Sequence, residues 1–218
     1  MNRLGYCRAF RAMLCVVLAS VTGGPLQAAI SLGEPRPLST AIERSEKPAV
    51  SPDGTRLAFI SNRSGADNIW VMPLDGEPTQ LTHETRPEVQ TSNPRWSPAG
   101  DFLVYTSNKG GTGGFDLWVI SADGQHDEPL TVDPALDWMP AWSPDGKRIA
   151  FVSDRDGADG LWLTNLDGSG VTKIADLAYE PVWSPDGSQL AAYHIAGQAD
   201  GIFLLSPDGA APPRCVLE

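Results

Sequence analysis

Three histidines are the residues of this 218-residue chain whose type most often serves in acid–base or nucleophilic chemistry. His83 opens a connecting segment, His126 follows a glycine-containing turn, and His194 ends an apolar run, so their surroundings differ. The sequence has no Gly-x-Ser-x-Gly, no His-Glu-x-x-His and no glycine-rich phosphate loop. We therefore expect a protein without enzymatic activity and without a cofactor.

One acidic segment has the residue types of a calcium loop. Asp154, Asp156 and Asp159 could offer carboxylate oxygens on either side of a glycine. The segment is shorter than the twelve-residue EF-hand loop and lacks its closing glutamate. The corresponding segments at 64–67 and 110–113 do not keep the acids. We predict a solvated hairpin turn and no metal site.

Cations recur after an apolar run at Arg63, Lys109 and Arg155, whereas the fourth copy has His194. They could form a basic ring that binds carboxylates of a partner. Alternatively, each could pair with an acid of the neighbouring repeat and hold the repeats together, and the regular recurrence favours this second interpretation. The candidate acids are Glu46, Asp137 and Glu180.

The candidate residues for contact with a partner also include two aromatic side chains. Trp138 is expected in a connecting loop, outside the two repeat positions that hold the other six tryptophans. Tyr179 lies in another variable connection. Variable loops on a fixed scaffold are the usual place for binding. The predicted partner-binding set is Arg63, Lys109, Trp138, Arg155, Tyr179 and His194.

The elements that position these residues are set by a repeated turn, Ser-Pro-Asp-Gly or a close variant, which separates two strand-like runs. Proline presets φ, aspartate can bond back to its own backbone, and glycine accepts a positive φ. The prolines recur in steps of 46, 46 and 41 residues. The turn residues are Pro52, Asp53, Gly54, Pro98, Gly100, Pro144, Asp145, Gly146, Pro185, Asp186 and Gly187.

Each repeat continues with a third apolar run, an Asp-Gly hairpin signal and a short fourth strand. Four strands with a period of 40–50 residues predict the blade of a β-propeller. We therefore predict an all-β propeller of about four blades, with tryptophans packed between them. The expected blades are residues 48–84, 94–133, 140–176 and 181–218.

The motif Pro-x-Trp-Ser-Pro-Asp-Gly, followed by Ile-Ala-Phe, Ile-Trp, Asp-Gly and Leu-Thr, resembles the TolB-like, WD-like propeller repeat of bacterial envelope proteins over residues 35–218. The resemblance implies a non-catalytic scaffold for protein–protein or small-ligand binding in the cell envelope. TolB proper has an additional N-terminal domain and six blades, which this sequence is not expected to contain. The alternative is a truncated substrate-gating propeller of a prolyl-oligopeptidase-like hydrolase, since the same repeat occurs there.

The N-terminal residues 1–29 are predicted to be a signal peptide. Three arginines precede an apolar run at 12–21 that is too short to span a bilayer, and Ala28 and Ala29 offer a cleavage point. An uncleaved anchor is the alternative. Cleavage would place the chain in the periplasm or outside the cell, and no later segment is expected to cross the membrane.

Residues 30–47 are expected to be a linker with one candidate closing strand, Pro35–Thr40. Paired beside residues 202–205, this strand would close a small ring. Otherwise the propeller is partial and could self-associate through an open blade edge.

Charge and cysteine content exclude some partners. The formal net charge is −11, and loss of the three N-terminal arginines would make it −14, which disfavours nucleic acid. Cys7 and Cys15 belong to the predicted signal, so Cys215 would remain alone and no internal disulfide is expected. Cys215 could pair between chains, although a partly buried apolar role is favoured.

Overall fold

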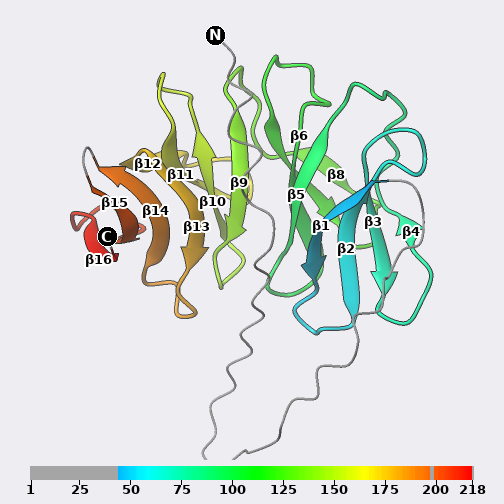
Figure 1. Cartoon of the computed structure of the whole chain (residues 1–218), viewed down its shortest axis with the longest axis horizontal. Helices are drawn as coiled ribbons and strands as arrows, with labels where there is room; N and C mark the ends of the chain where they lie inside the picture. Colours follow the sequence, from blue (N-terminus) through cyan, green and yellow to red (C-terminus); the bar gives the residue numbers. More distant parts are fainter. Residues whose placement is uncertain (1–43, 197–198, 218) are drawn as a thin grey trace, which may run out of the picture. The chain divides into compact units, whose positions relative to one another are not determined.

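Four antiparallel four-stranded sheets make up the computed structural model, which describes residues 44–196 and 199–217 (Figure 1). Each sheet is built from four strands consecutive in sequence, which we call blades 1 to 4. Blade 1 contains β1 (Ser45–Val50), β2 (Arg56–Ser61), β3 (Asn68–Pro73) and β4 (Thr79–Gln80). Blade 2 contains β5 (Thr91–Trp96), β6 (Phe102–Ser107), β7 (Asp116–Ser121) and β8 (Asp127–Pro129).

The second half of the chain repeats this order. Blade 3 contains β9 (Asp137–Trp142), β10 (Arg148–Ser153), β11 (Gly160–Asn165) and β12 (Thr172–Asp176). Blade 4 contains β13 (Ala178–Trp183), β14 (Leu190–Ala196), β15 (Ala199–Leu205) and β16 (Arg214–Leu217). The prediction of an all-β chain with four four-stranded blades is confirmed.

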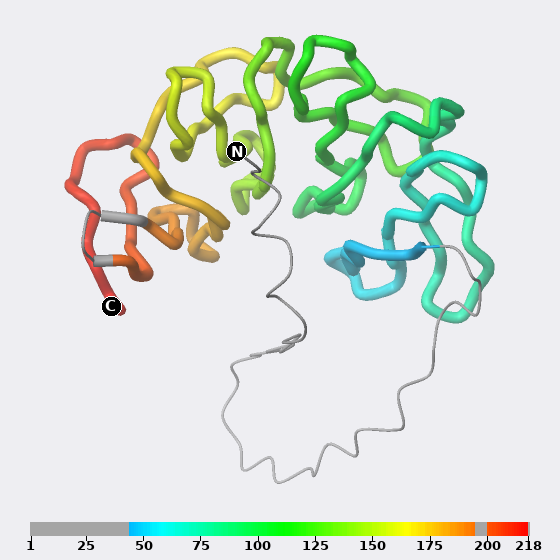
Figure 2. The backbone as a smooth tube through the Cα atoms, turned by 45° about the horizontal axis from the view of Figure 1, so that its top comes forward, coloured from blue at the N-terminus to red at the C-terminus, as the bar shows by residue number. Residues whose placement is uncertain are grey.

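The blades belong to one compact unit, Ser39–Glu218. Within it they follow one another along an arc, with blades 1 and 4 at its two ends (Figure 2). The predicted signal peptide and the Pro35–Thr40 segment lie outside the described residues. Both edges of β15 are occupied by β14 and β16, so a closing strand cannot pair beside residues 202–205. In the described part of the chain, no helix is long and apolar enough to cross a membrane.

The Ser-Pro-Asp-Gly turns are held by the serine hydroxyl. Ser51 Oγ donates to the Asp53 carboxylate at 2.5 Å and accepts the Arg56 N–H at 2.9 Å. Successive turns also stack. A Cβ on Gly100, whose φ is +73°, would stand 3.5 Å from Pro52 Cδ of the preceding blade. The repeated turn residues therefore also form joints between blades.

A second joint is made by the tryptophan that precedes each of the last three turns. Its indole N–H donates to a backbone carbonyl on the first strand of the preceding blade. The pairs are Trp96 with Ala49 at 3.0 Å, Trp142 with Arg95 at 3.0 Å, and Trp183 with Ala141 at 3.2 Å. In blade 1 this position holds Val50, which is 57% exposed.

The apolar core lies between the blades. One buried cluster joins blades 1 and 2, and it contains Ala58, Ile60, Ile69, Leu81, Trp96, Leu103, Tyr105 and Ile120. A second joins blades 2 and 3 through Val104, Leu117, Leu130, Ile149 and Phe151. A third joins blades 3 and 4 through Ala150, Leu161, Leu163, Ala178, Leu190, Ala192 and Leu205. Each blade thus depends on its neighbour for burial.

The first strand of every blade contains a β-bulge. The register shifts there, and the bulged residue has a positive φ although it is not glycine. These residues are Lys47, Asn93, Met139 and Glu180, with φ between 52° and 55°. Each precedes a proline, which has no N–H to give to the ladder and is tolerated where a bulge interrupts it.

The bulge explains an error in the sequence-based prediction. Trp138 was expected in a connecting loop, but it lies in β9 and pairs with Val152. Pro140 looked like the start of that strand, because proline seldom occurs inside a hydrogen-bonded strand. The bulge at Met139 lets the strand continue through the proline, so that it begins at Asp137.

The joint between blades 1 and 2 makes a stability prediction. Trp96 is 8% exposed, so Trp96→Ala removes a buried ring and its hydrogen bond. We expect a loss of about 3–5 kcal/mol in the free energy of unfolding, measured with urea. Val50→Ala changes the same repeat position in blade 1, where the side chain is 57% exposed, and should cost less than about 0.5 kcal/mol. Equal losses in the two variants would contradict the assignment of Trp96 to the joint.

Candidate functional site

The cation that follows the second strand of blades 1, 2 and 3 folds back over aromatic rings of its own blade. Arg63 lies 5.3 Å from the Phe59 ring centroid and 4.9 Å from that of Trp70. Lys109 lies 5.2 Å from Tyr105 and 3.9 Å from Trp118, and Arg155 lies 5.1 Å from Phe151 and 5.2 Å from Trp162. The recurrence therefore reflects a cation–π contact repeated in each blade.

Blade 4 departs from this arrangement. Its His194 ring lies 4.8 Å from the Phe203 ring at a tilt of 53°, and Phe203 takes the place of the third-strand tryptophan. The fourth blade thus keeps an aromatic contact but has no permanent cation at this position.

The acidic partners of the three cations differ. Arg155 pairs with Asp137 at 2.9 Å and with Asp133, on the connection from blade 2, at 3.1 Å. Lys109 pairs with Asp127 of blade 2. Arg63 donates to Ser61 Oγ at 3.2 Å and forms no ion pair with another described residue. Two members of the predicted basic ring are therefore already neutralised by the protein itself. The expected pairing with acids of a neighbouring repeat was wrong for Lys109–Asp127 and Arg155–Asp137, because each of these pairs lies within one blade.

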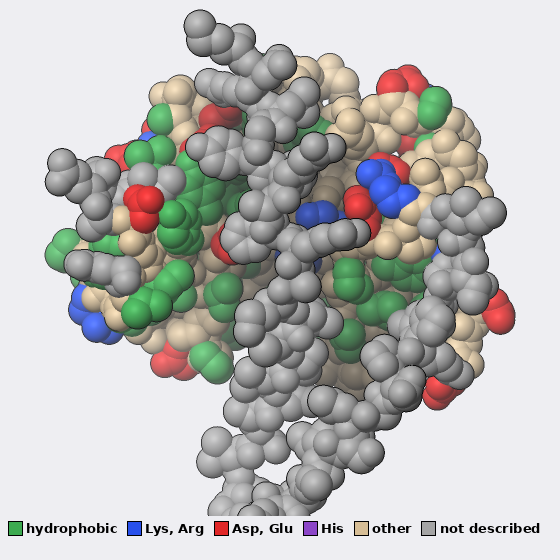
Figure 3. Space-filling model, in the orientation of Figure 1, with side chains coloured by type: hydrophobic (Ala, Val, Ile, Leu, Met, Phe, Trp, Pro, Cys, Tyr) green, Lys and Arg blue, Asp and Glu red, His purple; other side chains and the backbone are tan. Residues whose placement is uncertain are grey.

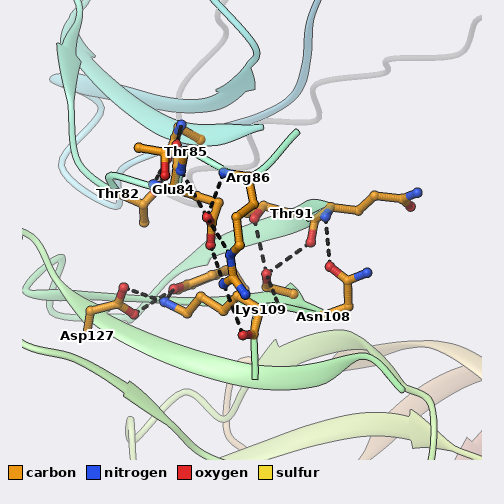
Figure 4. A network of polar contacts seen from close by, with 12 residues as sticks. Thr82, Glu84, Thr85, Arg86, Thr91, Asn108, Lys109 and Asp127 are labelled. Atoms are coloured by element: carbon orange, nitrogen blue, oxygen red, sulfur yellow. Dashed lines mark hydrogen bonds and ion pairs between the residues drawn. The ribbon is translucent and has the colours of Figure 1, made fainter. Parts of the chain in front are cut away.

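A cavity of about 300 Å³ lies between blades 1 and 2. Blade 1 and the connection after it contribute Leu81, Thr82, His83 and Glu84. Blade 2 contributes Thr91, Tyr105, Lys109, Ile120, Gly124 and Asp127. A Cβ on Gly124 would stand 3.3 Å from the Leu81 carbonyl oxygen, and the φ of +75° at this position also favours glycine. The lining is mixed: Leu81 and Ile120 are apolar, and the charged members Glu84, Lys109 and Asp127 belong to the network of polar contacts in Figure 4.

Three polar groups of blade 2 bind one another in this wall. Tyr105 donates its hydroxyl hydrogen to Asp127 Oδ1 at 2.6 Å. Lys109 donates to the Tyr105 oxygen at 2.5 Å and also to Asp127 Oδ2 (Figure 4). Burial and the charge of Asp127 raise the pKa of Tyr105, so the phenol stays protonated and can donate. Burial lowers the pKa of Lys109, and Asp127 opposes that change.

The connection between blades 1 and 2 is ordered by a second pair. The Arg86 guanidinium binds both oxygens of Glu84, at 2.9 and 2.8 Å, and donates to the Lys109 carbonyl at 3.2 Å. The hydrogen bond from the Arg86 side chain lowers the pKa of Glu84 to about 2. Arg86 thereby links the connection to the segment that carries Lys109 (Figure 4).

Of the six predicted partner-binding residues, only Lys109 lines this cavity. Trp138 lies in β9 of blade 3, and its indole nitrogen is buried without a partner among the described residues. Tyr179 lies in β13 and donates to Asp159 at 3.0 Å. Burial, together with that hydrogen bond, raises the pKa of Tyr179 to about 12.

The acids of the 154–159 segment face different partners. Asp154 accepts the Leu136 N–H at 2.8 Å, Asp156 binds Lys173, and Asp159 accepts from Tyr179. Among the described residues, no three acidic, histidine or cysteine side chains come together as a metal site would require.

Sequence reasoning missed Glu84, Arg86, Tyr105 and Asp127. One signal was available, because the repeat position of Phe59 and Phe151 holds a tyrosine in blade 2. A hydroxyl at a buried aromatic position needs a hydrogen-bond partner. Nothing in the sequence indicated that this partner would be Asp127, which is 22 residues away.

The Glu84–Arg86 pair predicts a pH dependence. The folded pKa of Glu84 is about 2, below the unfolded value of about 4.3. Ionised Glu84 therefore stabilises the fold above pH 4.3, and this contribution is lost as the pH falls towards 2. Glu84→Gln should be less stable than the wild type at pH 7, and the difference should shrink between about pH 4.3 and 2.

Urea unfolding at several pH values measures this difference. Glu88→Gln changes an exposed glutamate of the same connection and is the matched control, expected to alter stability little at any pH. A deficit of Glu84→Gln that is as large at pH 2 as at pH 7 would contradict the ionic role.

Comparison with known proteins agrees with this fold. A family model described as the TolB beta propeller domain matches residues 90–211. No match was found among curated proteins. A solved structure of putative TolB from Agrobacterium tumefaciens is 24% identical, with a TM-score of 0.67 over 78% of this chain and 64% of that chain.

Two further structures are similar to this chain. TolB from Acinetobacter baumannii is 23% identical, with a TM-score of 0.64 over 75% of this chain and 41% of that one. A puromycin-hydrolyzing peptidase from Mycobacterium tuberculosis is 19% identical, with a TM-score of 0.60 over 76% of this chain and 30% of that one. This chain thus spans less than two thirds of these relatives, and at such identities the likeness shows the fold alone. The match of the family model to more than half of the sequence confirms the resemblance, and the chain belongs to the TolB beta propeller domain family.

Proposed function

We propose that this chain is an exported, non-catalytic scaffold of the bacterial cell envelope that binds a protein partner. The cavity between blades 1 and 2 carries the proposal, because it lies where the variable connection of residues 83–90 meets blade 2. Its volume of about 300 Å³ is at the lower end of the range for ligand pockets. A volume of this size suits one inserted side chain or a small ligand.

The chemistry of the walls supports an inserted side chain with an apolar body and a polar tip. Leu81 and Ile120 are buried apolar residues, whereas Glu84, Lys109 and Asp127 are charged and already paired. A partner would therefore meet groups held in place by Arg86 and Tyr105, and less conformational entropy is lost on binding to such a rigid wall.

Export and the envelope location rest on the predicted signal peptide at residues 1–29 and on the family. The absence of the Gly-x-Ser-x-Gly and His-Glu-x-x-His motifs from the sequence supports a binding role. The partner-binding roles of Arg63, Trp138, Arg155, Tyr179 and His194 remain predictions. Arg63 is the best placed of these for a partner's carboxylate, because no described residue forms an ion pair with it.

A second candidate function is that of a substrate-gating propeller of a hydrolase. Its support is the likeness to the Mycobacterium tuberculosis peptidase, of which this chain covers 30%. We expect the purified chain to show no hydrolysis of chromogenic aminoacyl substrates. Turnover that co-purifies with the folded chain and is lost on unfolding would overturn the non-catalytic assignment.

Site-specific crosslinking tests the proposed partner site. A photoreactive benzoyl-phenylalanine replaces His83, which lines the cavity and is exposed. The matched control replaces Val132, which is 69% exposed on the connection between blades 2 and 3 and does not line the cavity. In an envelope extract we expect a discrete crosslinked protein from position 83 and none from position 132. Equal crosslinking at both positions, or none at either, would count against the cavity as the partner site.

A further inference from the structure

The joints between successive blades are built from equivalent residues, so one joint can be compared with the next. Glu84 after blade 1 and Asp133 after blade 2 occupy the same repeat position. The backbone N–H of each donates to a side-chain oxygen of the residue that begins the third strand of the preceding blade. Thr91 and Asp137 are also equivalent, because each begins the first strand of its blade and pairs with the serine that ends the second strand.

The joint between blades 2 and 3 contains a guanidinium that belongs to the chain itself. The Arg155 guanidinium binds both oxygens of Asp137, at 3.0 and 2.9 Å, and Asp133 at 3.1 Å. The Asp137 side chain is fully buried, and only 17% of the Arg155 side chain is exposed. The guanidinium therefore lies between the first strand of blade 3 and the connection that leads to it.

The joint between blades 1 and 2 has different residues at these positions. Lysine replaces the arginine, and threonine replaces the aspartate of the first strand. The Lys109 amine binds Tyr105 and Asp127 instead, on the second and fourth strands of blade 2 (Figure 4). The cavity is lined by Glu84 and Thr91, the two positions whose counterparts bind the guanidinium in the next joint. The cavity thus lies where the repeat places a guanidinium.

The walls of the cavity offer more hydrogen-bond acceptors than donors. A carboxylate has about four acceptor sites, and each oxygen of Asp127 accepts one hydrogen bond from a described residue. Glu84 Oε2 also accepts one, from Arg86. Lys109 has three N–H donors and gives two of them to Tyr105 and Asp127. A guanidinium, which has five N–H donors and no acceptor, suits such walls.

The charges around the cavity favour a cation. Among the lining residues Glu84 and Asp127 are acidic and Lys109 is basic, which leaves an excess of negative charge when histidine is counted as neutral. Arg86 lies outside the lining and is bound to Glu84, and a glutamate shared by two arginines is a known form of ion-pair triad. Acidic side chains are spread over much of the face shown in Figure 3, and the formal net charge of −11 attracts basic partners.

The apolar part of the lining fits the stem of an arginine side chain. Leu81 is 8% exposed and Ile120 is 1% exposed, and both line the cavity. The methylene groups of arginine pack along apolar surface while the charged head reaches polar groups. His83 lines the cavity and is exposed, so a side chain can enter from solvent beside it.

We propose that the cavity between blades 1 and 2 binds the guanidinium of an arginine side chain on the protein partner, at the repeat position that Arg155 fills in the next joint. The partner's guanidinium donates to Asp127 and Glu84, and its methylene groups lie against Leu81 and Ile120. The inference rests on the proposed function for the source of the arginine, whereas the preference of the cavity for a guanidinium is measurable with a small probe.

Titration of the purified, isotope-labelled chain with N-acetyl-arginine amide, followed by nuclear magnetic resonance, measures this preference. A single side chain binds weakly, so we expect a Kd of about 1 mM and shifts at residues that line the cavity. The citrulline derivative has nearly the same shape but a neutral urea group, and it should bind at least about tenfold more weakly. The lysine derivative should also bind more weakly, because an ammonium lacks the planar fork of donors.

A double variant, Thr91→Asp with Lys109→Arg, gives this joint the ion pair of the next one. Its affinity for the arginine derivative should fall at least about tenfold, because the chain's own guanidinium then occupies the site. Glu84→Gln removes an acceptor charge and should weaken binding several-fold. Glu88→Gln changes an exposed glutamate of the same connection outside the lining and should bind like the wild type. Circular dichroism identifies a variant that fails to fold, and the comparison of probes needs no variant.

Three outcomes would overturn the inference: no binding of the arginine derivative up to about 20 mM, equal affinity for either control derivative, or undiminished affinity in the folded double variant. The crosslinking experiment separates this inference from the proposed function. A protein crosslinked from position 83, without binding of the arginine derivative, would overturn the arginine and keep the partner site. Binding of the derivative without any crosslinked protein would support the guanidinium site and count against a protein partner.

Discussion

Each blade of this protein is held to the next by side chains, because no ladder of backbone hydrogen bonds joins one described sheet to another. A directional contact that recurs in the described part of the chain is the indole N–H of a tryptophan, donated to a carbonyl 42 to 47 residues earlier. The glycine of each of the last three turns also packs against the proline of the turn in the preceding blade. Apolar packing supplies most of the free energy, and these two contacts set how the sheets are aligned.

The first strand of each blade has a second recurring feature, a residue with a positive φ. A positive φ at Lys47, Asn93, Met139 and Glu180 is unfavourable for residues other than glycine, yet it occurs at the same position in all four blades. The bulge lets proline occupy a strand, because it interrupts the ladder of hydrogen bonds at that point. Tertiary packing thus maintains a backbone conformation that local preference alone would not select.

The blades differ most in the residues that follow their second strands and in the connections between blades. Arg63, Lys109 and Arg155 all stack on rings of their own blade, but their acidic partners differ. Where the aromatic residue is Tyr105, its hydroxyl recruits Asp127 and Lys109, and a cavity lies beside this group. Blade 2 therefore differs from the other blades in the hydroxyl of Tyr105 and in the connection of residues 83–90 that meets it.

Local signals in the sequence determined the four repeats, the four strands in each and the turns between them, because hairpin ladders and turns join residues close together in the chain. The tryptophan spacing also indicated the packing between blades. Only the tertiary structure decided that Trp138 lies in a strand and that Tyr105 meets Asp127. These outcomes depend on contacts between residues far apart in sequence, whose geometry is set when the blades pack together.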